Sequence, residues 1–283
     1  MNIEIIPVYK YLDAYITDVE NRVDTVEALW SKYAIDPYWA TLCQYAPHDL
    51  SDRKPKPITD IATLKKQIDL LNPIDLAKLK DEFQKVADLL PNYDDDPICV
   101  ALYPLSDDNS TVNKFQNGII GSSTFGHMLI NINPLADSFL QWIPYVFAHE
   151  YHHTVWGNYW YAIYGGQLEN QFVNSLLIDG EADSFALSVY PHLKPKWLFD
   201  MSYDLEQSLW KNHYSKIVLE QDVDYGKYMF GDHHSGIPWC AGYAIGYRMV
   251  QQFLIKNPQI TFKRLLEIRP INIFRESEYG VFL

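Results

Sequence analysis

The chain has 283 residues, of which 48% are hydrophobic and 21% charged, as in globular proteins large enough to bury a sizeable core. Its 36 acidic residues outnumber its 23 basic residues, for a formal net charge of −13, so neither a nucleic acid nor an anionic membrane surface is an expected partner. The three cysteines lack the spacing of a disulfide framework or a zinc knuckle, and neither a signal peptide nor a membrane-spanning segment is recognisable, which predicts a cytoplasmic protein.

The N-terminal portion, residues 1–92, is predicted to be helical. Apolar residues recur at helical spacing in residues 18–34, 58–72 and 73–90. The last of these segments begins with a proline, which helices tolerate in their first turn. We expect this portion to precede a catalytic domain, residues 93–283, or to form one compact unit with it.

A β-rich region follows the N-terminal helices. Residues 98–105, "ICVALYPL", have the composition of a strand, and residues 117–134 contain strand-like runs separated by glycine turns. The acidic residues Asp94–Asp96 lack the glycine and the terminal glutamate of a calcium-binding loop, and a solvated turn is predicted there.

Helices are predicted again from residue 137 onward. One contains "FAHEYHHTVW", residues 147–156, one spans residues 168–190, and two lie near the C-terminus, of which one covers residues 240–257. The pattern as a whole predicts an α+β fold that is predominantly helical and contains a small β-sheet.

The stretch His149-Glu150-Tyr151-His152-His153 has the form H-E-x-x-H. On a helix, His149 and His153 lie one turn apart on the same face, close enough to bind one metal ion. Two neutral imidazoles anchor Zn²⁺, and Glu150 accepts the proton of a metal-bound water. The alternative is a pair of core histidines satisfied by hydrogen bonds to other polar groups. His152 is not expected to be a ligand.

A catalytic zinc ion needs a third protein ligand besides the two histidines. The following helix contains the sequence "DGEAD", which offers Asp179, Glu181 and Asp183. Residues two positions apart on a helix point about 200° away from each other, so Asp179 and Glu181 do not both reach one ion without distortion.

The HExxH motif, followed by a helix that offers acidic residues as a third ligand, resembles the gluzincin pattern of thermolysin-like peptidases. More closely, the blocks "AHEYHH", "FVNSLLIDGEADSFA" and "AGYAIGYRMVQQFL" resemble the YjaZ-type family of predicted zinc-dependent proteases. The resemblance implies a zincin-like catalytic core with a small sheet beside the HExxH helix. It also implies hydrolysis of peptide or protein substrates with Glu150 as the general base. Residues 121–126 would then be an edge strand that pairs with a peptide, although an ordinary hairpin also fits them.

The chain departs from this family at the position of the third ligand. The family's block is glutamate-glycine-x-alanine, and the corresponding residues here are Asp179-Gly180-Glu181-Ala182. This register favours Asp179 as the ligand and leaves Glu181 as the alternative. Asp183 would orient a ligating imidazole from one turn further along the helix. Tyr243, in the third block, is a candidate donor to the oxyanion, and the alternative is an ordinary packing tyrosine.

We therefore predict a zinc-dependent peptidase with His149, His153 and Asp179 as ligands of Zn²⁺. One alternative is a zinc hydrolase that acts on a non-peptide amide. The other is a metal-stabilised, chaperone-like module that binds peptides and has lost its catalytic activity. The sequence predicts neither the cleavage specificity nor the oligomeric state.

Overall fold

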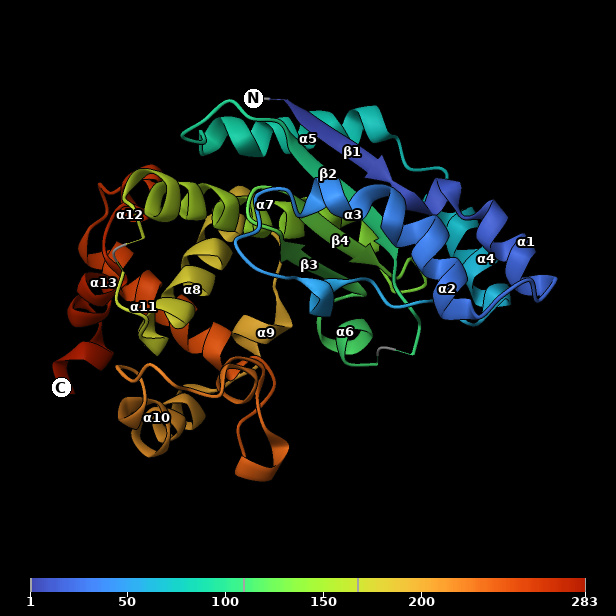
Figure 1. The fold of residues 1–283 in the computed structure, drawn as a ribbon. Helices are drawn as coiled ribbons and strands as arrows, with labels where there is room; N and C mark the ends of the chain where they lie inside the picture. The colour runs from blue at the N-terminus through green and yellow to red at the C-terminus, as the bar shows by residue number, and fades with distance from the viewer. Residues whose placement is uncertain (1, 109, 167, 283) are drawn as a thin grey trace. The chain divides into compact units, whose positions relative to one another are not determined.

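The computed structural model describes residues 2–108, 110–166 and 168–282. The chain divides into two compact units, Met1–Thr154 and Val155–Leu283, which are described separately; Figure 1 labels their elements. This division does not coincide with the boundary expected between the helical N-terminal portion and the catalytic domain, and that domain assignment stays a prediction.

A mixed β-sheet lies in the first unit. Within the described residues its strands are, in spatial order, β1 (Ile3–Pro7), β2 (Ile98–Pro104), β4 (Met128–Ile132) and β3 (Ile119–Ser123). β1 and β4 each pair with β2 in parallel, whereas β3 returns antiparallel to β4. Every residue of β2 is buried, which explains why its sequence shows no polar alternation. The β-rich region predicted in the middle of the chain is confirmed.

The strand β1 was not predicted from the sequence. It has only five residues, and its partner is distant in the chain, since Ile3 lies opposite Ile98. Parallel strands require a long crossover connection, and the N-terminal helices supply it here. The local sequence of residues 3–7 therefore does not reveal the partner of this short strand.

Helices and short helical turns connect β1 to β2. Their bounds are η1 (Val8–Tyr11), α1 (Asp13–Glu20), α2 (Val26–Trp30), η2 (Ser31–Ile35), α3 (Asp36–Leu42), η3 (Ser51–Arg53), α4 (Ile61–Leu71) and α5 (Leu76–Leu89). Helices α4 and α5 confirm the two predicted helices, and both begin at an aspartate cap. The side chains of Asp60 and Asp75 each accept a hydrogen bond from a backbone N–H of the first turn. The helix expected over residues 18–34 is divided among α1, α2 and η2.

The HExxH helix is α7 (Phe139–Gly157), which follows β4; the short α6 (Ser110–Phe115) precedes β3. In the first unit α7 packs against α5, where the rings of Phe83 and Phe147 stack with centroids 3.9 Å apart. The hydroxyl of Tyr151 donates a hydrogen bond of 2.9 Å to the carbonyl oxygen of Leu90, just beyond α5. A residue in the middle of the motif thus anchors α7.

The second unit is helical over its described residues. Its elements are η4 (Asn158–Ile163), α8 (Phe172–Val189), α9 (Lys196–Phe199), α10 (Tyr203–Asn212), η5 (Tyr214–Lys216), η6 (Gly226–Phe230), η7 (His233–Ser235), α11 (Ala241–Lys256), α12 (Phe262–Leu265), α13 (Pro270–Glu276) and η8 (Glu278–Phe282). Helices α8 and α11 confirm the predicted helices over residues 168–190 and 240–257.

The helices α8 and α11 cross in direct backbone contact. A Cβ atom added at Gly180 of α8 would touch the carbonyl group of Gly246 and lie 2.8 Å from the backbone nitrogen of Tyr247. A Cβ atom added at Gly246 would lie 2.7 Å from the carbonyl carbon of Leu176. Both glycines therefore permit a close approach, and residues 179–186 of α8 are buried without interruption.

The fold is mainly helical with a small mixed sheet, which confirms the predicted α+β class; a gluzincin-like core stays a prediction. In the part of the chain that the structure describes, no helix combines the length and the apolar character needed to cross a membrane.

Candidate metal centre

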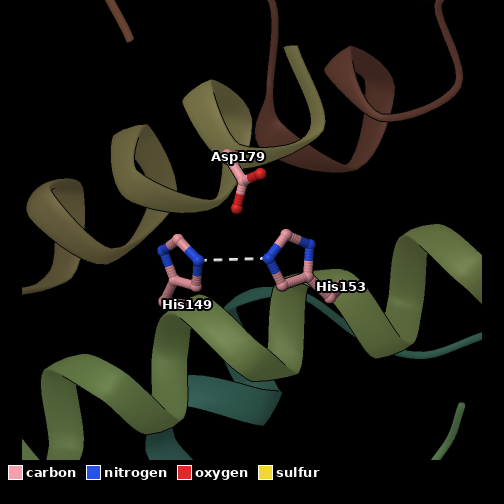
Figure 2. Close-up of side chains that lie close together, drawn as sticks. All are labelled: His149, His153 and Asp179. Atoms are coloured by element: carbon pink, nitrogen blue, oxygen red, sulfur yellow. Dashed lines mark hydrogen bonds between the residues drawn. The ribbon is translucent and has the colours of Figure 1, made fainter. Parts of the chain in front are cut away.

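Helix α7 places two histidines one turn apart on one face. The Nε2 atoms of His149 and His153 are 3.1 Å apart, and the two rings meet edge to face with centroids separated by 4.7 Å (Figure 2). Zinc ligands about 2 Å from the metal in tetrahedral geometry lie about 3.4 Å from one another. The spacing of the two nitrogens therefore fits two ligands of one zinc ion.

Glu150 lies between these histidines in the sequence and is largely buried, with 7% of its surface exposed. Its side chain lies against Gly121 of β3, in the same unit. His152 is fully buried and is not part of the pair formed by His149 and His153.

Asp179 of α8 completes a group of three potential metal ligands. One ligand atom each of His149, His153 and Asp179 lies within 4.8 Å of the others, and in Figure 2 the carboxylate is directed toward the two imidazoles. Among the residues that the structure describes, this is the group found to suit a metal ion, and Glu181 is not a member of it. Two imidazole nitrogens and one carboxylate oxygen form a donor set typical of catalytic zinc.

The other two acidic residues of "DGEAD" are fully buried in α8. Burial raises the pKa of the Glu181 carboxyl group well above its ordinary value. The indole Nε1 of Trp197 in α9 donates to the two carboxylate oxygens of Asp183 over 3.4 and 3.3 Å. The expected role of Asp183 in orienting an imidazole stays a prediction.

Tyr243 lies on α11 and is half-buried. Its ring packs near Phe230, with the centroids 5.7 Å apart, at the edge of the hydrophobic core of the second unit. One turn further along α11, Tyr247 has its pKa raised by burial and by the charge of Asp183. Tyr243 is not part of the group of potential metal ligands, and its role as oxyanion donor stays a prediction.

Two residues near the predicted site residues were not singled out by the sequence analysis. Gly121 contacts Glu150, and a glycine inside a strand is a recognised sign of close approach, so its signal was present. Trp197 contacts Asp183 from a separate short helix, and nothing in its local sequence distinguishes it from the other tryptophans.

Comparison with known proteins gives one family. Residues 77–275 match the profile of DUF2268, which is described as "Predicted Zn-dependent protease", and this region contains all three members of the group of potential metal ligands. The chain is also similar to "Uncharacterized protein YjfC" of Bacillus subtilis (strain 168), with 30% identity over 197 residues. The aligned region covers 64% of this chain and 60% of that relative. No solved structure matches the chain.

Proposed function

The chain belongs to the DUF2268 family of predicted Zn-dependent proteases, and from this premise we propose that it hydrolyses peptide bonds in peptide or protein substrates. His149, His153 and Asp179 would hold one zinc ion. The observation that carries the proposal is the 3.1 Å separation of the two histidine Nε2 atoms, with a carboxylate in the same group. When bound, zinc would polarise the scissile carbonyl and lower the pKa of a water ligand to about 7.

Glu150 is proposed as the general base. It is adjacent to His149 on α7, and its carboxylate is largely buried, so bulk water does not surround it. The carboxylate would accept a proton from the attacking water and then donate it to the amine nitrogen of the leaving peptide. Its contact with Gly121 supports this assignment because it holds the side chain in one place.

Asp179 is proposed as the third ligand in preference to Glu181. Its membership of the group with His149 and His153 supports this choice. Glu181 is two positions further along the same helix and therefore points about 200° away. Asp179 occupies the position at which the related proteases have glutamate, and aspartate oxygen is also a competent zinc ligand.

Tyr243 is kept as the proposed donor to the oxyanion. A hydroxyl that donates a hydrogen bond to the developing charge would affect kcat more than KM, because the charge appears only in the transition state. Comparison of Tyr243→Phe with Tyr247→Phe tests this role. An unchanged kcat for Tyr243→Phe would assign the residue to packing.

The metal site is tested by a matched pair of neutral substitutions. We expect wild-type protein and Glu181→Gln to retain one zinc per chain by elemental analysis, whereas Asp179→Asn and His153→Ala lose it. The two amide variants keep nearly the volume of the original side chain. A difference in their zinc content therefore reports on the lost negative charge and not on a cavity. If Asp179→Asn retained zinc and Glu181→Gln lost it, Glu181 would be the third ligand and Asp179 would not.

The reaction is tested with a peptide library digested by wild type and by Glu150→Gln. We expect cleavage by the wild type and a loss of at least about hundredfold in the variant, since general-base catalysis contributes about 10²- to 10⁴-fold. Equal residual activity in both proteins would refute Glu150 as the base. Stoichiometric zinc without hydrolysis of any peptide would favour a binding module.

A further inference from the structure

Gly121 of β3 lies directly against the side chain of Glu150, and both residues belong to the first unit. A Cβ atom at position 121 would lie 2.5 Å from Cγ and 2.7 Å from Cδ of Glu150. These distances are far shorter than ordinary carbon–carbon contacts of about 3.5–4.0 Å. Any side chain at position 121 would therefore compete with Glu150 for the same space.

The backbone conformation does not explain the glycine at this position. Among the described residues, the glycines with positive φ are Gly118, Gly126, Gly165, Gly166, Gly231 and Gly236. Gly121 is not one of them, and it pairs regularly with Ile130 of β4. Glycine inside a strand lowers stability relative to alanine, so the presence of glycine at position 121 needs another explanation. The contact with Glu150 supplies it.

A shift of Glu150 would matter because its carboxylate is confined. Only 7% of the residue is exposed, so it has little room to rotate away from an added methyl group. In an active site, displacement of a reacting group by about 1 Å lowers the rate by about hundredfold. A methyl group at position 121 would force a displacement of this order.

We infer that Gly121 is a positioning residue: its missing side chain leaves the space in which the Glu150 carboxylate is held against β3. This role rests on the proposed function of Glu150 as the general base. It predicts one effect on the folded protein that needs no metal, and a second effect on the reaction.

The first effect is measured on zinc-free protein with a double-mutant cycle. Gly121→Ala in the wild-type background overpacks the contact and is expected to raise the unfolding equilibrium constant by about tenfold or more. In the Glu150→Ala background, the methyl group added by Gly121→Ala occupies the space left by the Glu150 side chain. The substitution then also removes the destabilisation that glycine causes inside a strand. There the same substitution is expected to lower the constant by about two- to fivefold. An equal effect of Gly121→Ala in both backgrounds would overturn the inference.

The second effect is measured on zinc-loaded protein as separate kcat and KM values. We expect Gly121→Ala to keep its zinc and its KM while kcat falls by about tenfold to hundredfold. Gly226→Ala in η6 is the control and should keep kcat within about twofold, because a Cβ atom there would meet only Asp224 Oδ1 at an ordinary distance of 3.5 Å. Full kcat in Gly121→Ala would refute the positioning role. Absence of hydrolysis by the wild type would refute the proposed function and this role with it, and the zinc-free cycle would still decide whether the contact exists.

Discussion

Substitution of Gly246 by alanine should separate the helices α8 and α11. A Cβ atom at this position would lie 2.7 Å from the carbonyl carbon and 3.2 Å from the Cα atom of Leu176, and closer still to its carbonyl oxygen. All three atoms are backbone atoms in the middle of a buried helix, so no side chain can rotate to make room. The strain is relieved only if one helix moves.

The expected loss of stability combines two opposing terms. Alanine is favoured over glycine inside a helix by about 1 kcal/mol. Overpacking of a close-packed interior costs about 1–3 kcal/mol, and the upper end applies here because the neighbour is backbone. The net result is destabilisation by about 2 kcal/mol, equivalent to a rise of about thirtyfold in the unfolding equilibrium constant.

Urea unfolding of zinc-free protein, followed by circular dichroism, measures this change. Gly157→Ala in α7 is the matched control, because a Cβ atom there would meet no atom within 4 Å and the backbone is helical. The control should be stabilised by up to about 1 kcal/mol. If Gly246→Ala were as stable as the wild type, the backbone contact between α8 and α11 would not exist as described.

Three further predictions concern other parts of the chain. Burial raises the pKa of Glu206 to about 7 despite its ion pair with Arg248, so stability that is present below pH 4.5 is lost as pH rises through 7. The loss is at most about 3 kcal/mol, and Glu206→Gln should abolish this part of the pH dependence of the urea midpoint; an unchanged profile would refute the shifted pKa. Zinc at about a hundred times its Kd should stabilise the wild type by about 2.7 kcal/mol, as measured by thermal unfolding with and without chelator, and should not stabilise His153→Ala. Phe83→Ala, which removes the buried ring stacked on α7, should cost about 3–5 kcal/mol by urea unfolding, whereas Leu89→Ala at an exposed position of the same helix should cost less than about 0.5 kcal/mol.

Periodicity was sufficient to find the helices whose apolar residues form a stripe. Helices α4 and α5 were predicted from the spacing of their apolar residues, and the structure adds only the aspartate caps that define where they begin. The fully buried β2 was recognised from its composition. In contrast, β1 was missed because a short run of isoleucines becomes a strand only when the distant β2 offers it a partner.

The pairing of the two histidines proposed as metal ligands was predictable because it depends on local geometry alone. Once residues 147–156 are helical, the spacing of four between His149 and His153 places both imidazoles on one face. No tertiary contact is needed for that conclusion, and the 3.1 Å separation of their Nε2 atoms agrees with it.

The choice between Asp179 and Glu181 could not be made from local geometry. An amphipathic helix reveals its orientation by its polar face, but α8 is buried without interruption through this segment. Its rotation is instead set by packing, in which Gly180 lies against α11. One ligand atom of Asp179 lies within 4.8 Å of one from each histidine, which supports the proposal of Asp179 as the third ligand, and the tertiary structure also places Gly121 against Glu150. The sequence alone determined the helix that carries the two histidines and the glutamate, because residues one turn apart on a helix are neighbours in any fold.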